Sequence, residues 1–284
     1  MVPHYAATIT GLFEEIATAA SEWIGVILLS GDPALSEAFV ARQARADRFA
    51  IVVAPYDTPW IRDRGPIAVR EADGSIGWVL PRMVEPDRPD DDRLFETIAA
   101  RPYTRSPLAI AQGNLVAGAD GLALSTSRVL HENRLRQEDL AAFAPALGIR
   151  DWIVFEPFPG EPTGHADVHV RFLAPDLMAV AWHHEDRGLQ RQASEIEDRV
   201  RAIRPQMRSI RVPLAHIDQH FASAVNWVQI GQHVLLPVYE AMPQALVDET
   251  RALLAGAGFV TQALVSPTLE LGGSLHCLTA SVFV

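Results

Sequence analysis

Three short segments of the chain contain residue types that could carry out chemistry. Asp63 stands between two arginines in the first, Trp60-Ile61-Arg62-Asp63-Arg64-Gly65-Pro66. His165 and Asp167 stand two residues apart in the second, Glu161-Pro162-Thr163-Gly164-His165-Ala166-Asp167. The single cysteine, Cys277, follows two glycines in the third, Gly272-Gly273-Ser274-Leu275-His276-Cys277-Leu278-Thr279. A histidine beside a carboxylate suits acid–base catalysis or metal binding, and a free thiolate is a nucleophile.

Each segment also has an ordinary structural interpretation. Asp63 could belong to a solvated charged loop, the pair His165 and Asp167 could be structural, and Cys277 could be an inert core residue. On an extended strand His165 and Asp167 would point to the same face, and we expect a strand to present Cys277. Asp63 and His165 each lie ten residues before a hairpin turn signal, so they occupy equivalent positions in a repeat.

The elements that must position these residues recur along the chain. Apolar spacing from Ile9 to Trp23 predicts a helix, and buried strands are expected at residues 26–29 and 51–53 with a helix at 34–44 between them. Hairpin turn signals then stand at Asp73, Asp120, Pro175 and Gly231, at spacings of 47, 55 and 56 residues. Helices are expected after the last three hairpins, at residues 138–147, 190–203 and 243–255, each leading to a strand, at 152–155, 209–212 and 259–264.

A period of about 50 residues is typical of solenoids and closed propellers, and this length accommodates about five units. A last strand at residues 275–284 would pair with the N-terminal elements and close a ring. We see no linker, so residues 1–284 are expected to form a single domain. The alternative is a set of ordinary hairpins in an α+β domain.

Composition narrows the function classes. The formal charge is −11, and all 24 basic residues are arginines, so lysine chemistry is excluded. Nucleic acids and anionic membranes bind basic surfaces, so neither is an expected partner, whereas a small cationic molecule is. The oligomeric state, including a homo-oligomer, stays open. One cysteine, no signal peptide and no apolar span predict a cytoplasmic protein.

The chain has ten histidines, a residue type that commonly binds metal ions. Residues 183–186 (His-His-Glu-Asp) and the series His165, Asp167 and His169 could supply ligands. The chain nevertheless lacks an H-E-x-x-H sequence, and adjacent histidines on a strand point apart. We therefore predict no metal and no cofactor.

Taken together and in this order, the three segments resemble the agmatine deiminase and bacterial peptidylarginine deiminase family. The matching patterns are W-x-R-D-x-G-P, G-H-x-D with Arg171-Phe172 shortly after it, and G-G-x-x-H-C-x-T. Gln112-Gly113-Asn114 and Ala222-Ser223-Ala224-Val225-Asn226-Trp227 resemble two intervening segments of the family. The resemblance runs from about Val52 to Thr279. It implies the pentein fold, an α/β five-bladed propeller with pseudo-fivefold repeats.

The resemblance also implies roles for individual residues. Asp63 and Asp167 would bind the guanidinium group, His165 would be the general acid–base, and Cys277 would be the nucleophile. Further candidates for substrate binding in or near these segments are Trp60, Glu161, Arg171 and Asn114. The implied enzyme is a hydrolase of C–N bonds in linear amidines that converts an agmatine-like substrate to a ureido product and ammonia through an S-amidino-cysteine, as in putrescine biosynthesis.

Three other functions stay open on the same site. Peptidyl-arginine could be the substrate, an amine could replace water as in an amidinotransferase, or the chain could be a non-catalytic binding module. The first strand begins almost at once, whereas the family carries an extra N-terminal segment. Tyr56-Asp57-Thr58-Pro59 and Leu271-Gly272-Gly273 also depart from the family pattern. These segments shape the pocket, so the resemblance defines the reaction class rather than the substrate.

Overall fold

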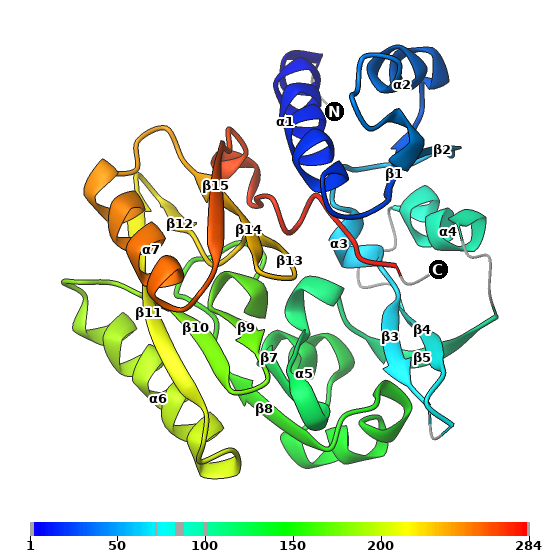
Figure 1. The fold of residues 1–284 in the computed structure, drawn as a ribbon. Helices are drawn as coiled ribbons and strands as arrows, with labels where there is room; N and C mark the ends of the chain where they lie inside the picture. Colours follow the sequence, from blue (N-terminus) through cyan, green and yellow to red (C-terminus); the bar gives the residue numbers. More distant parts are fainter. Residues whose placement is uncertain (1–2, 72, 83–87, 99–101, 283–284) are drawn as a thin grey trace.

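Five small β-sheets make up the β-structure of residues 3–71, 73–82, 88–98 and 102–282, which the computed structural model describes (Figure 1). Four of the sheets repeat one pattern, in which a hairpin is followed by a crossover to a parallel third strand. In the first, β3 (Ile67–Arg70) pairs antiparallel with β4 (Ile76–Arg82), and β4 pairs parallel with β5 (Tyr103–Ala109). A parallel pair needs a long connection, which α4 (Pro89–Ile98) supplies.

The same pattern recurs three times. The second sheet contains β6 (Val116–Ala117), β7 (Leu122–Thr126) and β8 (Asp151–Phe155). The third contains β9 (Val170–Ala174), β10 (Leu177–Trp182) and β11 (Arg208–Ile217), with β12 (His220–Ser223) added at the edge. The fourth contains β13 (Val228–Ile230), β14 (His233–Val238) and β15 (Val260–Val265). The crossovers contain α5 (Arg128–Asn133), α6 (Arg187–Ile203) and α7 (Gln244–Gly256). All four predicted hairpins are therefore confirmed.

The N-terminal unit is shorter. Helix α1 (Pro3–Ser21) precedes β1 (Val26–Ser30), and α2 (Pro33–Val40) and the 3₁₀ turn η1 (Ala46–Arg48) connect β1 to the parallel strand β2 (Phe49–Val53). The Asp32 carboxylate caps α2 by accepting from the N–H groups of Ala34 and Leu35. The helix predicted at residues 34–44 ends early, because Arg42 and Gln43 donate to carbonyls three residues back and tighten the chain into turns.

Two other predicted elements are wrong. Residues 138–147 form two 3₁₀ turns, η4 (Gln137–Ala142) and η5 (Pro145–Leu147), because Pro145 has no N–H to continue a helix and Gly148 turns the chain with a φ of 66°. Residues 275–282 contain no strand, and the last two predicted residues lie outside the described ranges. The N–H groups of Leu278 and Thr279 donate to nearby carbonyls of residues 274 and 276, which makes turns.

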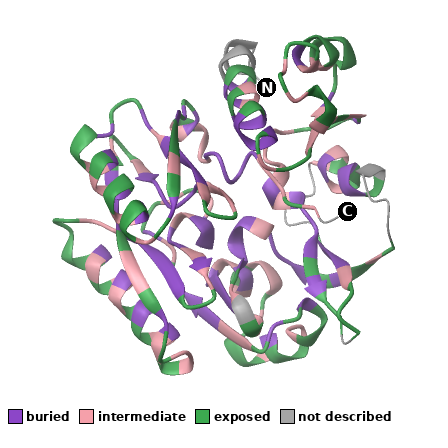
Figure 2. Cartoon of the chain, viewed as in Figure 1, coloured by how far each residue is buried: buried purple, intermediate pink, exposed green. Residues whose placement is uncertain are grey.

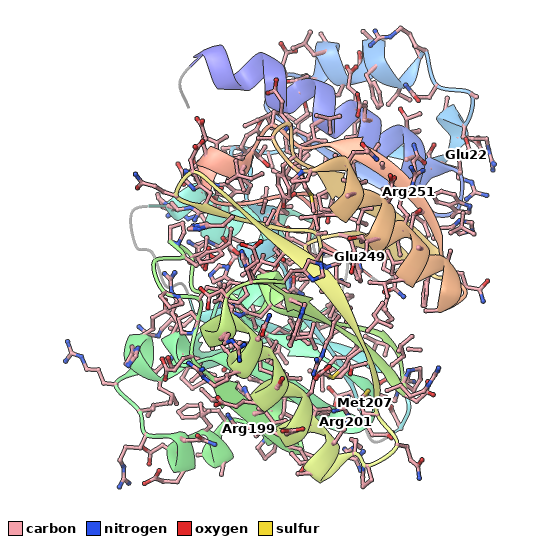
Figure 3. All side chains as sticks on the ribbon, turned by 90° about the vertical axis from the view of Figure 1, so that its left-hand side faces the viewer. Glu22, Arg199, Arg201, Met207, Glu249 and Arg251 are labelled. Carbon is pink, nitrogen blue, oxygen red and sulfur yellow. The ribbon has the colours of Figure 1, made fainter. Side chains whose placement is uncertain are left out.

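The core lies between the sheets and the helices that cover them (Figure 2). Helix α6 buries Leu189, Ala193, Ile196 and Val200 at helical spacing, so one face packs inward. Figure 3 views the outer side of α6 and α7, with Arg199 and Arg201 labelled on α6 and Glu249 and Arg251 on α7. Within the described residues, no helix has the length and apolar character to cross a membrane.

Candidate active site

Polar segments stand immediately before the first strand of the hairpin in all four complete units. They are α3 (Ile61–Arg64) before β3, η2 (Gln112–Asn114) before β6, η6 (Ala166–Val168) before β9, and the loop 224–227 before β13. A fifth segment, the turn at residues 274–279, follows β15 and the 3₁₀ turn η7 (Leu269–Leu271). Equivalent places in repeated units thus contribute most of the candidate site.

Gly113 shows how closely these segments approach one another. A Cβ atom at Gly113 would lie 2.8 Å from Nδ1 of His165, and 3.3 Å from both Asp63 Oδ1 and Asp167 Oδ2. Three polar side chains from α3 and the turn before β9 therefore surround one small volume. A real Cβ atom does not approach other atoms as closely as 2.8 Å, so a residue larger than glycine would displace His165.

His165 and Asp167 are not on a strand, contrary to the prediction from their spacing. Gly164 has a φ of 61°, His165 precedes η6, and Asp167 lies within that 3₁₀ turn. The positive φ reverses the chain before His165, a conformation that glycine adopts at little cost. Nδ1 of His165 lies 3.5 Å from Oδ1 of Asp63, and the His165 side chain is 7% exposed.

Asp167 is fully buried and is held by His276. Nδ1 of His276 lies 2.6 Å from Oδ2 of Asp167, and NH1 of Arg171 lies 2.6 Å from the other ring nitrogen, Nε2. Burial raises the pKa of Asp167 to about 6, although the nearby His165 and Arg171 favour the charged carboxylate. Burial, followed by the positive charges of Arg171 and Arg62, holds the pKa of His276 well below its usual value. His276 is therefore neutral at pH 7.

Cys277 lies in the turn 274–279 and not on the predicted strand. Its Sγ is 3.4 Å from Oδ1 of Asn226 and 4.0 Å from Oδ2 of Asp167. Burial raises the pKa of the Cys277 thiol well above its usual value, and the carboxylates of Asp167 and Asp63 raise it further. The free protein therefore holds a neutral thiol at pH 7, and a cation beside it would favour the thiolate.

Arg62 fastens this turn to α3. Its backbone N–H donates to the Cys277 carbonyl at 3.2 Å, its Nε donates to the His276 carbonyl at 3.2 Å, and its NH1 donates to Oε1 of Gln112 at 3.1 Å. Gln112 is oriented in turn, since its Nε2 donates to the Pro66 carbonyl at 2.8 Å. Burial lowers the pKa of Arg62 to about 10, so the guanidinium stays charged at pH 7.

Sequence reasoning missed the roles of Arg62, Gln112 and His276, and it assigned no catalytic role to Asn226. All four stand inside the motifs that carry the family resemblance. Their position in the same motifs as Asp63, Asp167 and Cys277 was the one feature of the sequence that could have indicated a role in the site. Their contacts join segments that are far apart in the chain, which no local pattern reveals.

The other predicted substrate-binding residues have contacts within the protein. A Cβ atom at Gly273 would lie 2.5 Å from the Trp60 ring, so the indole packs on that glycine. Oδ1 of Asn114 accepts from the N–H and hydroxyl of Thr126 at 2.9 and 3.0 Å. The Glu161 carboxylate accepts from the Thr163 hydroxyl at 2.8 Å and from the Gly164 N–H, and Glu161 lines a cavity of about 30 Å³.

Two carboxylate oxygens in the site have no hydrogen-bond donor. They are Oδ1 of Asp63 and Oδ1 of Asp167, both buried. A buried acceptor without a donor is costly, and a planar cation with several N–H groups would satisfy both. Within the described ranges, no three His, Cys, Asp or Glu side chains are grouped so that they could hold a metal ion.

Solved structures share this mixed α/β fold. Agmatine deiminase from C. jejuni superposes with a TM-score of 0.80 at 18% identity, covering 97% of this chain and 87% of that one. Agmatine deiminase of Enterococcus faecalis gives 0.73 at 16% identity, covering 95% and 86%. A dimethylarginine dimethylaminohydrolase gives 0.54 at 14% identity, covering 90% and 98%. These likenesses establish the fold.

Family membership comes from the sequence match. The model of the family described as Porphyromonas-type peptidyl-arginine deiminase matches residues 1–282, almost the whole chain. Deiminases are hydrolases of C–N bonds, so the predicted family and the predicted enzyme class are both confirmed. This chain belongs to the Porphyromonas-type peptidyl-arginine deiminase family.

Proposed function

We propose that this protein hydrolyses a C–N bond of a small guanidino compound, releasing ammonia and leaving a ureido product. The observation that carries the proposal is that the Asp63 and Asp167 carboxylates lie around the same space as His165, with Oδ2 of Asp167 4.0 Å from the sulfur of Cys277. Each of these carboxylates also has one buried oxygen without a donor. A guanidinium group has the planar array of N–H donors that two carboxylates can bind.

Binding and nucleophile activation are coupled in this mechanism. Burial is the main cause of the raised pKa of Cys277, and the Asp167 and Asp63 carboxylates raise it further. The substrate cation neutralises these two carboxylates, and its own positive charge favours the thiolate. The thiol proton passes to His165, and Sγ then attacks the guanidinium carbon. His165 donates a proton to the departing nitrogen, the C–N bond breaks, and an S-amidino-cysteine remains as ammonia leaves.

Water completes the cycle. His165, now neutral, accepts a proton from a water molecule that attacks the amidino carbon. The C–S bond breaks, Cys277 recovers its electron pair and the ureido product leaves. The balance is one water consumed and one ammonia released, and no cofactor is required.

The burial of the site favours a small substrate over a peptide. Cys277 and His165 are only 7% and 6% exposed, whereas arginine in a peptide needs room for the adjoining main chain. Agmatine is the first candidate, because solved neighbours with the same fold are named agmatine deiminases, one of them a cysteine-to-serine variant with substrate bound. With agmatine as substrate the chain would act in putrescine biosynthesis.

We also infer that the repeated units are blades of a five-bladed α/β propeller within a single catalytic domain of residues 1–284. Four sheets share the hairpin and parallel-strand pattern, and the N-terminal sheet supplies the parallel pair of a fifth. The segments at equivalent places before four hairpins support an axis near the site.

A substrate panel tests the function. Ammonia release should be measured with agmatine, arginine, methylated arginines and arginyl peptides, with the Cys277→Ala variant as control. We expect release from free agmatine and none from the variant. A ureido product indicates hydrolysis, whereas a new guanidino compound formed only when an amine is added would indicate amidino transfer. Turnover by Cys277→Ala would exclude covalent catalysis at this residue.

A further inference from the structure

Arg171, His276 and Asp167 form a continuous chain of short contacts that ends at the proposed guanidinium-binding carboxylate of Asp167. Arg171 NH1 lies 2.6 Å from Nε2 of His276, and Nδ1 of the same ring lies 2.6 Å from Oδ2 of Asp167. The side chains of His276 and Asp167 are 8% and 1% exposed. Water therefore competes little for these contacts.

The arginine determines which nitrogen of His276 carries the proton. A guanidinium group has only donors, so Nε2 of His276 must accept from Arg171 and be unprotonated. The ring proton is then on Nδ1, where it is donated to Oδ2 of Asp167. Arginine alone would bind a carboxylate through both oxygens, whereas one imidazole N–H takes only Oδ2 and leaves Oδ1 free.

We infer that His276 and Arg171 are positioning residues that fix the orientation of the Asp167 carboxylate for the substrate guanidinium. They do so through Oδ2, the oxygen that also lies 4.0 Å from the sulfur of Cys277, and they leave Oδ1 without a donor from the protein. The consequence for catalysis rests on the proposed function, but the protonation pattern does not. His276 needs no side-chain contact to keep its backbone in place. Its N–H donates to the Asn226 carbonyl at 3.1 Å, and its carbonyl accepts from Nε of Arg62 at 3.2 Å. The imidazole is therefore available for Asp167.

The tautomer is tested without substrate. In ¹⁵N NMR spectra at pH 7, the signals that disappear in His276→Asn belong to His276. We expect shifts of a neutral ring protonated at Nδ1. A ring protonated at Nε2, or an imidazolium, would overturn the inference even if the protein proves to be an active deiminase.

Two substitutions test the positioning role. Asn has an amide N–H near the place of Nδ1, so His276→Asn keeps a donor for Asp167, whereas His276→Leu has none. We expect His276→Leu to lower kcat/KM by about 10- to 100-fold, mainly through KM, the usual worth of one charge-assisted hydrogen bond. His276→Asn should recover most of this loss. His184→Asn, a surface change on the His184–Glu249 contact, is the control and should retain parental kinetics.

The outcomes separate the two proposals. Equal losses in the Asn and Leu variants, matched by equal losses in Tm, would mean that His276 only supports the fold. Parental KM in His276→Leu would also refute the positioning role. If the parent protein releases ammonia from no member of the substrate panel, the proposed function fails, and the NMR result still decides whether Arg171 and Asp167 fix the His276 tautomer.

Discussion

The sulfur of Cys277 lies 3.4 Å from the amide oxygen of Asn226, so the segments that precede β13 and follow β15 meet at this contact. Asn226 also donates to the Asp167 carbonyl at 3.5 Å. One neutral amide therefore contacts both the nucleophile and the main chain of Asp167. Its neutrality matters because two carboxylates already raise the pKa of the thiol.

Asn226→Asp should therefore make the thiolate harder to form. A third carboxylate beside Sγ raises the pKa of Cys277 further, and one unit corresponds to about a tenfold loss of thiolate. We expect alkylation by iodoacetamide at pH 8 to slow about tenfold or more. Cys277 is the single cysteine, so the mass shift reports it alone. Alkylation after denaturation is the control, and equal rates in the folded proteins would contradict the prediction.

Gly113→Ala should inactivate the enzyme with little loss of fold. The added methyl group would lie 2.8 Å from Nδ1 of His165 and fill the space between the two carboxylates. We expect kcat/KM to fall by about 100-fold or more, since small displacements of reacting groups carry penalties of that order. Gly11→Ala in α1 is the matched control, because nothing lies within 4 Å of its Cβ. It should raise Tm slightly and leave activity unchanged.

Asp63→Asn should weaken substrate binding. The amide keeps the size of the carboxylate but loses the charge opposite the guanidinium, and charge-assisted hydrogen bonds are roughly twice as strong as neutral ones. We expect KM to rise about tenfold or more and kcat to fall as well, because less cation is held beside the thiol. Asp73→Asn makes the same charge change in the β3–β4 turn and should match the parent. An unchanged KM for Asp63→Asn would show that Asp63 does not bind the guanidinium group.

His165→Asn should impair proton transfer more than binding. Departing ammonia and attacking water would both lack the group that moves their protons, which is typically worth about 10²–10⁴-fold in rate. Steady-state kinetics should show the loss in kcat, and mass spectrometry should show whether an S-amidino adduct accumulates on Cys277. Near-parental turnover would exclude His165 as the proton carrier.

Asp167→Asn should stabilise the protein while abolishing its activity. The pKa of Asp167 is about 6 in the folded state, above the ordinary 3.8, so the folded protein binds this proton more tightly than the unfolded chain does. Stability is therefore lost as pH rises from about 4 to about 6 and stays lost above that. The neutral amide avoids this loss, roughly 1–3 kcal/mol. Urea unfolding should show equal stability below pH 4 and a more stable variant at pH 7, and the reverse order would refute the pKa shift.

Local chemistry explains which elements could be predicted. The four hairpins follow from turn residues such as Asp73-Gly74 and Gly231, whose conformations are decided within a few residues. The inward face of α6 follows from apolar spacing. The helix predicted at residues 138–147 does not form. Pro145 lacks the N–H that a helix needs there, and Gly148 turns the chain with a left-handed conformation, although the apolar spacing is helical.

The candidate residues Asp63, His165, Asp167 and Cys277 were selected from the sequence by their motifs, and the sequence alone also determined the repeated hairpins and the family. Tertiary structure decided how these residues are presented. The sequence at Leu275–Leu278 predicts a strand, but its backbone groups bond to Arg62 and to the Asn226 carbonyl instead of to a neighbouring strand, and the segment forms a turn. The roles of His276 and Gln112 likewise depend on partners about 50 to 110 residues away, because hydrogen bonds depend on proximity in space, and folding brings distant segments together.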